Sequence, residues 1–130
     1  MSIARRYEDL DVWKQARLLA ASTYKITENL RSRDLFLMRQ MRGAAVSILS
    51  NIAEGFGRST NKEFAQFLSV SRASASELQS QCYIALDQQF ITGQDFARMY
   101  ENVDHISRML SKLIKYLRST HYAERGTPNA

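Results

Sequence analysis

The stretch SNIAEGFGR, residues 50–58, holds the residue types in this chain that come nearest to a chemical site. Asn51 and Glu54 could supply an amide and a carboxylate, and Gly55 and Gly57 could form a loop around a phosphate. A Walker loop needs a glycine five residues before its second glycine, a lysine beside that glycine, and a strand in front. Here the first position is isoleucine, the lysine is absent and the preceding pattern is helical, so the spacing excludes a Walker loop.

Few other residues in the sequence could bind a metal or take part in catalysis. Di-iron sites in helical bundles use Glu-x-x-His pairs on facing helices, and no such pair occurs. His105 falls in a helical pattern and His121 in the tail, while Cys82 falls on an apolar helical seam, where a buried thiol is expected. A single cysteine leaves neither zinc-ligand spacing nor an internal disulfide. With no Ser/His/Asp grouping either, we predict a non-enzymatic protein with no metal and no cofactor.

Composition predicts one helical domain over residues 1–130. The chain has one proline and five glycines, so about 120 residues run almost without helix breakers. The N-terminus lacks the apolar segment of a signal peptide, and no apolar run approaches ~18 residues, so we expect a cytoplasmic protein that makes no use of a membrane. A net charge of +5 permits an anionic partner, but it also serves solubility.

Apolar periodicity predicts four helices. Asp9 or Asp11 is the expected N-cap of the first, and Thr60 with Glu63 forms a capping box before the third. Short connections make neighbouring helices antiparallel, so the fold class is all-α, an antiparallel up-down-up-down four-helix bundle. The ordered core is expected over residues 7–118, with a mobile tail over 119–130. The helices are predicted at about 10–30, 34–55, 60–88 and 92–117.

Polar residues within the second and third helices predict a buried polar seam. The chain reverses near Arg58, so residues whose numbers total about 116 are expected to lie level on the two helices. This places Arg42 level with Ser74 and Arg39 level with Glu77. Glu54 is then expected beside the free N–H groups that begin the third helix. Buried polar groups must be paired, so Glu77→Ala is expected to cost about 1–3 kcal/mol. The predicted seam comprises Arg39, Arg42, Asn51, Glu54, Ser74 and Glu77.

Basic residues form a second candidate site, on the outer positions of the first and fourth helices. One interpretation is complementarity between cations and the dipole at the C-terminus of the fourth helix. The other is a ridge that contacts phosphates and is repeated by oligomerisation. Tyr83, Tyr100, Tyr116 and Tyr122 could stack on bases or line a subunit interface. The candidate nucleic-acid-binding residues are Lys14, Arg17, Lys25, Arg108, Lys112, Lys115 and Arg118.

Three segments resemble a known family. DLDVWKQA, QMRGAAVSILSNIAEGFGRSTNKEFAQFLSVSRASASELQSQ and ALDQQFI are similar to the four-helix-bundle family of 23S-rRNA-intervening-sequence proteins, which is related to the accessory variability determinants of diversity-generating retroelements. The signature positions matched here are Trp13, Arg42, Asn51, Glu54, Gly55, Gly57, Glu63, Phe64, Phe67, Ser74 and Glu77. The chain departs from the family at Leu49, where proline is frequent, and at Gly43, where arginine is usual.

The resemblance implies a homopentameric ring of bundles with no established enzymatic activity. It also implies that relatives in retroelements bind a reverse transcriptase and nucleic acid through a basic surface. The first hypothesis is therefore an oligomeric module whose basic surface binds RNA, DNA or a reverse-transcriptase-like protein. The alternative is a scaffold that self-assembles or binds proteins and has no nucleic-acid ligand.

Overall fold

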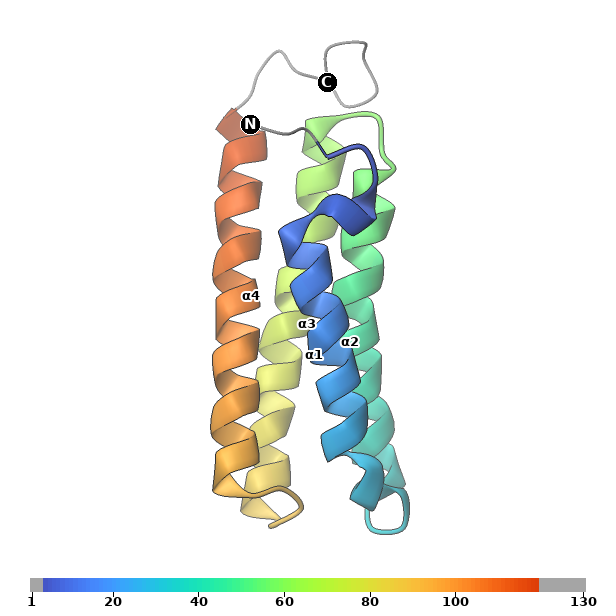
Figure 1. Ribbon diagram of the computed structural model, residues 1–130, viewed down its shortest axis with the longest axis vertical. Helices are drawn as coiled ribbons and strands as arrows, with labels where there is room; N and C mark the ends of the chain where they lie inside the picture. The colour runs from blue at the N-terminus through green and yellow to red at the C-terminus, as the bar shows by residue number, and fades with distance from the viewer. Residues whose placement is uncertain (1–3, 120–130) are drawn as a thin grey trace.

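The computed structural model describes residues 4–119, which form helices joined by short connections and contain no strand. This confirms the prediction of an all-α chain with four long helices (Figure 1). The tail beyond Ser119, including His121 and Tyr122, lies outside the described residues. Two short 3-10 helices, η1 and η2, flank the first long helix. The elements are η1 Tyr7–Asp9, α1 Asp11–Ile26, η2 Glu28–Arg31, α2 Leu35–Phe56, α3 Asn61–Asp87 and α4 Gly93–Ser119.

Side-chain caps begin three of the long helices. The Asp34 carboxylate accepts a hydrogen bond of 2.9 Å from the Leu37 N–H at the start of α2. The Thr60 hydroxyl oxygen accepts one of 3.1 Å from the Glu63 N–H at the start of α3. The Thr92 hydroxyl oxygen accepts one from the Asp95 N–H at the start of α4. These bonds satisfy amides that an α-helix leaves without an internal partner.

The first helix differs from its prediction at both ends. Its N-cap position is Leu10, which makes no side-chain cap, whereas Asp9 lies in η1 and accepts hydrogen bonds from the N–H groups of Arg5 and Arg6. The helix ends at Ile26, and Leu30 belongs to the separate helix η2. The apolar spacing continues across this break, so periodicity alone joined α1 and η2 into one helix.

Side chains from all four helices form one apolar core that runs the length of the bundle. α1 contributes Leu19 and α2 contributes Met41 and Ile48, all of which are fully buried. On α4, Phe96 and Leu113 are only half-buried. The buried residues of α4 form one apolar stripe and are Met99, Val103, Ile106, Leu110, Ile114 and Leu117.

The helices lie side by side, so the connections between them gather at the two ends of the bundle (Figure 1). α1 descends in Figure 1, α2 rises, α3 descends and α4 rises. α2 packs against α3, α3 against α4, and α1 against both α2 and α4. The start of α1, the α2–α3 turn and the end of α4 therefore share the upper end. The α1–α2 and α3–α4 connections share the lower end.

Candidate functional site

Charge is distributed unevenly between the two ends of the bundle. The upper half, residues 4–21, 47–72 and 104–119, carries eleven Lys and Arg against six Asp and Glu. The lower half, residues 22–46 and 73–103, carries six of each. The net charge of +5 therefore belongs entirely to the upper half, which we call the cationic end. The other half is called the neutral end.

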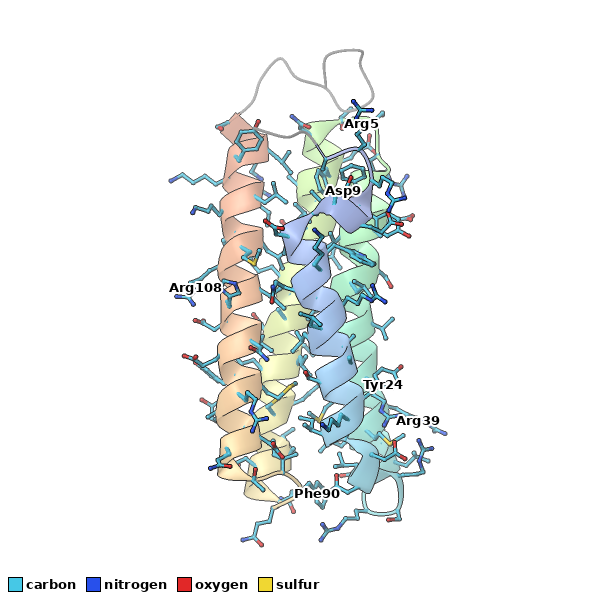
Figure 2. The ribbon with its side chains drawn as sticks, in the orientation of Figure 1. Arg5, Asp9, Tyr24, Arg39, Phe90 and Arg108 are labelled. Carbon is cyan, nitrogen blue, oxygen red and sulfur yellow. The ribbon has the colours of Figure 1, made fainter. Side chains whose placement is uncertain are left out.

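Three basic side chains form a ridge along the outer side of α4. Arg108, Lys112 and Lys115 are four and three residues apart, so they lie on one face of the helix. All three are exposed, and Figure 2 shows Arg108 projecting away from the bundle. Arg108 pairs with Asp104 at 3.5 Å, whereas Lys112 and Lys115 have no ion pair within residues 4–119. Arg118 is exposed one turn further on. The ridge thus leaves several cations available to an anionic partner.

The basic residues predicted on the first helix divide between the two ends. Lys14 and Arg17 are exposed in the upper half, and the Arg17 guanidinium lies 5.9 Å from the centre of the Trp13 ring. Lys25 lies at the neutral end, where it lines a cavity. The structure therefore gathers six of the seven candidates at one end and separates Lys25 from them.

Several cations of this end were not among the sequence candidates. Arg5 and Arg6 precede η1, Arg58 and Lys62 flank the α2–α3 turn, and Arg72 lies midway along α3. Arg5, Arg6, Arg58 and Lys62 lie near a helix end or turn that the bundle topology brings to the same end, whereas Arg72 carries no such signal in the sequence. Three of these cations are already engaged. Arg6 pairs with Glu8 at 4.0 Å and Arg58 pairs with Glu54 at 3.1 Å. Arg72 donates a hydrogen bond to the Ser111 hydroxyl.

The main cluster of aromatic side chains does not lie at the cationic end. Tyr83, Phe96 and Tyr100 form a ring cluster between α3 and α4 at the neutral end, with Tyr83 and Phe96 centroids 4.8 Å apart. Tyr116 is the exposed tyrosine of α4 that lies beside the basic ridge. Two of the tyrosines predicted to stack on bases, Tyr83 and Tyr100, are therefore remote from the charge that would hold a phosphate backbone.

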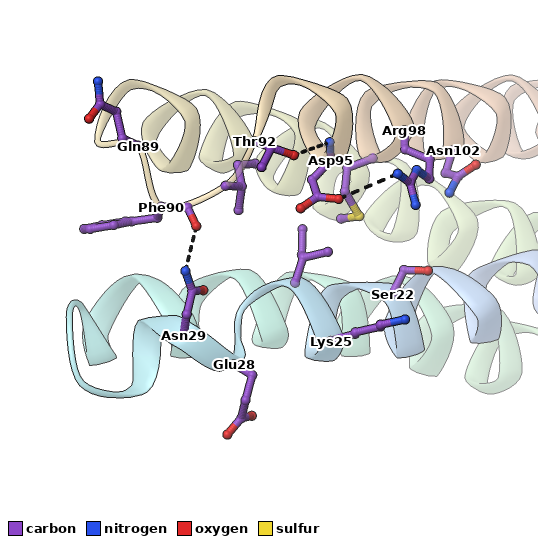
Figure 3. Close-up of a pocket in the computed structure, with 13 residues that line it drawn as sticks. Ser22, Lys25, Glu28, Asn29, Gln89, Phe90, Thr92, Asp95, Arg98 and Asn102 are labelled. Atoms are coloured by element: carbon purple, nitrogen blue, oxygen red, sulfur yellow. Dashed lines mark hydrogen bonds and ion pairs between the residues drawn. The ribbon is translucent and has the colours of Figure 1, made fainter.

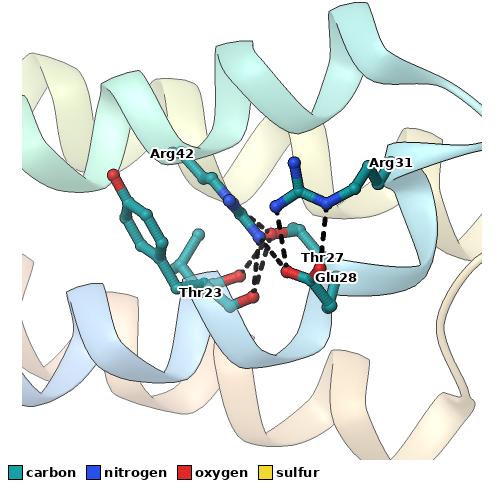
Figure 4. A network of polar contacts seen from close by, with 6 residues as sticks. Thr23, Thr27, Glu28, Arg31 and Arg42 are labelled. Atoms are coloured by element: carbon teal, nitrogen blue, oxygen red, sulfur yellow. Dashed lines mark hydrogen bonds and ion pairs between the residues drawn. The ribbon is translucent and has the colours of Figure 1, made fainter.

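Arg42, predicted to face Ser74 in the polar seam, lies instead against α1 and η2 (Figure 4). Its guanidinium donates hydrogen bonds of 3.0 Å to the Thr27 hydroxyl, the Tyr24 carbonyl and the Glu28 carboxylate. It also lies 4.4 Å from the centre of the Tyr24 ring. Because the Tyr24 carbonyl belongs to the last turn of α1, Arg42 caps that helix from a neighbouring one.

The same network holds the Glu28 carboxyl ionised. Hydrogen bonds from Arg31 and then Arg42 lower the pKa of Glu28 from 4.5 to about 2. Arg31 donates at 2.9 Å from within η2, and Arg42 donates from α2. The carboxylate therefore joins η2 to α2 with charge on both sides, although its own side chain is largely exposed.

Contacts between α2 and α3 occur about one helical turn away from the predicted register. Ser47 and Ser74 share a hydrogen bond of 2.8 Å, and the Ser71 hydroxyl donates to the Ile48 carbonyl at 2.9 Å. The prediction treated the turn as symmetric about Arg58. In the structure, the rotation of each helix decides which side chains face the neighbour, so the contacting pairs depend on packing as well as on distance from the turn.

The predicted seam is therefore rearranged. Asn51 donates to the Ser47 carbonyl at 2.8 Å and hydroxyl at 3.1 Å, and Ser47 in turn contacts Ser74. Glu54 was expected at the start of α3, but it is exposed and pairs with Arg58. Arg39 and Glu77 were expected to pair, but both are exposed and neither has a polar partner within residues 4–119. The α2–α3 seam thus consists of small neutral groups and no buried ion pair.

The two glycines of SNIAEGFGR have different roles in the structure. Gly57 is the C-cap of α2 at φ −77°, a value open to any residue. Gly55 lies inside α2, where an added Cβ would come within 2.6 Å of the Phe67 Cβ and 2.9 Å of the Phe64 ring. Gly55 is therefore required for the close approach of α2 and α3, since any side chain would force them apart.

Groups capable of catalysis are separated in the part of the chain that the structure describes. Within residues 4–119, no three His, Cys, Asp or Glu side chains lie close enough together to hold a metal ion. Cys82 is buried, and desolvation raises the pKa of its thiol to about 11. At neutral pH the thiol is therefore protonated and a poor nucleophile. His105 is exposed on α4. No helix among the described residues is long and apolar enough to cross a membrane.

Comparison with known proteins agrees with this helical architecture. The family model of the 23S rRNA-intervening sequence proteins matches residues 8–112. The chain belongs to this family. The match covers all of α1, α2 and α3 and most of α4, including Arg42, Gly55 and the Ser47–Ser74 contact, but it stops before Lys115 and Arg118. Two members of the basic candidate set thus lie beyond the segment that defines the family.

A solved structure similar to this member of the 23S rRNA-intervening sequence family shows the same fold. It is the crystal structure of a protein with unknown function from the S23 ribosomal protein family of Bacteroides thetaiotaomicron. The TM-score is 0.74 at 20% sequence identity, and the match covers 80% of this chain and 98% of that one. No protein with a curated description matches the chain.

Proposed function

We propose that this protein assembles as a homopentameric ring of antiparallel up-down-up-down bundles and binds nucleic acid through its cationic end. The observation that carries the proposal is the concentration of the entire net charge of +5 in one half of the bundle. A ring would repeat that end around its axis. Repetition multiplies phosphate contacts, and each contact releases counterions from the nucleic acid.

The ridge on α4 is the proposed centre of this surface. Lys112 and Lys115 have no ion pair within residues 4–119, so binding a phosphate would not require breaking an existing one. Only Arg108 has an internal acidic partner in the ridge, and that pair is exposed at 3.5 Å, which makes it weak. The ridge is a compact row of cations. It offers charges for phosphates but no pocket or side chain arranged to contact base edges, so it favours contact with the phosphate backbone over recognition of sequence.

Salt-dependent binding to a fluorescent RNA hairpin and a DNA duplex tests the proposal. The test variant carries Arg108→Gln, Lys112→Gln and Lys115→Gln, and the matched control carries Lys25→Gln, Arg39→Gln and Arg98→Gln in the neutral end. Both variants lose three exposed cations. The slope of log affinity against log salt should fall in the test variant by about 2–3 for each subunit that contacts the nucleic acid, and by much less in the control. Equal slopes in the two variants, or binding that ignores salt, would contradict a phosphate-binding ridge.

A second candidate is a self-assembling scaffold or protein-interaction module without a nucleic-acid ligand. Exposed apolar side chains favour it, because Phe36 is 72% exposed on α2 and Val70 and Ile84 are half exposed on α3. Contiguous patches of exposed apolar side chains mark sites of protein–protein contact, and these three residues are candidates for such a patch. A reverse-transcriptase-like protein is a further proposed partner of the cationic end. A ring that binds neither RNA nor DNA at low salt would favour the scaffold. We propose a cytoplasmic location in either case.

A further inference from the structure

The cavity at the neutral end lies on the opposite half of the molecule from the cationic end. It is an open cavity, bordered by the last turn of α1 and the start of η2 on one side and by the α3–α4 loop and the first turns of α4 on the other (Figure 3). Its volume is about 770 Å³. Cavities of this size accommodate small organic ligands.

Two cations from different helices border this cavity. Lys25 of α1 has no polar partner within residues 4–119. Arg98 of α4 has an ion pair with Asp95, but the two atoms are 3.8 Å apart and form no hydrogen bond. Glu28 also lies at the rim, but its carboxylate points away from the cavity in Figure 3 and is held by Arg31 and Arg42. Two cations therefore face one available carboxylate, which favours an anionic ligand.

Neutral donors and an apolar floor complete the lining. The Ser22 hydroxyl on α1 and the Asn102 amide on α4 make no hydrogen bond within residues 4–119, so both can donate to a ligand. Beneath them, Ile91 is 7% exposed and Met99 is 2% exposed. The cavity thus offers charge at its rim and an apolar surface below, an arrangement that suits a ligand with one charged and one apolar part.

The α3–α4 loop that borders the cavity is held in a defined position. The Asn29 amide of η2 donates a hydrogen bond of 2.8 Å to the Phe90 carbonyl, which ties η2 to the α3–α4 loop. The Phe90 N–H donates to the Ala85 carbonyl at 2.8 Å, and Gln89 between them adopts φ 61°. Left-handed backbone at a residue other than glycine is maintained only where its surroundings require it. A ligand would therefore meet walls that are already in place.

We propose that this cavity binds a small organic anion, a phosphate or carboxylate attached to a short apolar group. Lys25 and Arg98 hold the anion from the two sides, and Ser22 and Asn102 donate hydrogen bonds to it. The apolar group rests on Ile91 and Met99. The first turn of α4 adds a favourable dipole for negative charge at the same position. This site is independent of nucleic-acid binding, because it lies in the other half of the molecule.

Titration of the full chain with phenyl phosphate and with benzoate, followed by amide chemical shifts, tests the proposal. We expect saturable shifts at residues that line the cavity and none at the α4 ridge. Benzyl alcohol supplies the ring without the charge, and inorganic phosphate supplies the charge without the ring. Weaker binding of both than of phenyl phosphate is the expected result. Equal affinity for benzyl alcohol, or no saturable shift with either anion, would overturn the proposal.

Three single variants identify the groups involved. Lys25→Gln and Arg98→Gln should each weaken the preferred anion by about fivefold, since each removes one partly exposed charge from the rim. Asp95→Asn should tighten binding, because it removes the carboxylate that competes for Arg98. Lys112→Gln, which removes a cation from the other end, should leave the affinity unchanged. Unchanged affinity in both Lys25→Gln and Arg98→Gln, or weaker binding in Asp95→Asn, would place the anion elsewhere and contradict the site.

Discussion

At the scale of single residues, Gly55 marks a close approach between α2 and α3. The Phe67 Cβ and the Phe64 ring occupy the space that a side chain at this position would need. Phe64 is 1% exposed and packs edge-on against Phe56, with ring centroids 5.9 Å apart, so it has little room to move. The loss of stability when Gly55 is replaced by a larger residue therefore reports how closely α2 and α3 approach each other.

Gly55→Ala should lower the free energy of unfolding by about 1–3 kcal/mol, because the new methyl group overpacks the α2–α3 interface. Urea denaturation measures the change. Gly57→Ala is the matched control, since its Cβ would come no closer than 3.5 Å to another atom and its φ is negative. The control should be neutral or slightly stabilising. Similar losses in both variants would mean that backbone freedom, and not close approach, explains these glycines.

Arg42 contacts α1 and η2 and not Ser74 as predicted, and these contacts determine how much stability its removal should cost. Its side chain is 13% exposed and serves three acceptors, so Arg42→Ala should cost about 1–3 kcal/mol. Arg42→Lys should recover part of this loss, because an ammonium cannot reproduce the planar set of donors. Thermal denaturation checks both variants.

Glu77→Ala provides the contrast, and the expectation of a loss of about 1–3 kcal/mol from the sequence is withdrawn. Glu77 is exposed and has no polar partner within residues 4–119, so its removal should stay within about 0.5 kcal/mol of the parent. A large loss of stability in Glu77→Ala together with a small one in Arg42→Ala would support the polar seam that was predicted from the sequence.

At the scale of elements, Glu28 joins η2 to α2, and acid should loosen this connection. The folded pKa of Glu28, about 2, is below its ordinary value of 4.5. Its contribution to stability is therefore fully present above pH 4.5 and is lost as the pH falls toward about 2. In Glu28→Gln this part of the acid dependence should disappear. The comparison is the urea midpoint of parent and variant across that pH range. Parallel curves would show that Arg31 and Arg42 do not stabilise the ionised form.

The starts of α3 and α4 were predictable because their signals are local. Thr60 and Thr92 precede α3 and α4 by the spacing that lets a hydroxyl oxygen accept from an amide three residues on, and both make that bond. The end of α1 was not predictable from periodicity. Thr27 lies between α1 and η2, and its hydroxyl donates to the Thr23 carbonyl and accepts from Arg42. That interruption depends on a residue from another helix.

At the scale of the whole molecule, the proposed ring has a simple test in molecular mass. Light scattering should give five times the chain mass of 14.9 kDa in both low and high salt, because exposed apolar contacts such as Phe36 depend little on screening. Phe36→Glu should weaken assembly if that side chain is covered by a second copy. Lys112→Gln, on the basic ridge, should leave the mass unchanged. A monomer in the parent protein would contradict the ring.

The sequence by itself determined the fold class, the approximate helix boundaries and most of the core. Helix periodicity, caps and the scarcity of proline and glycine are properties of neighbouring residues, so they are visible without any partner. The family could also be identified from short segments such as SNIAEGFGR. The stripe on α4 from Met99 to Leu117 was predictable for the same reason, since one face of one helix carries it.

Only the tertiary structure decided which residues from different helices meet. Three features depend on how each helix is rotated and shifted against its neighbours. They are the partners of Arg42, the contact between Ser47 and Ser74, and the cavity beside Lys25 and Arg98. Those offsets are set by packing at positions such as Gly55, where the absence of a side chain lets two helices touch. The collection of charge at one end has the same origin, because residues distant in the sequence become neighbours only when the bundle has formed.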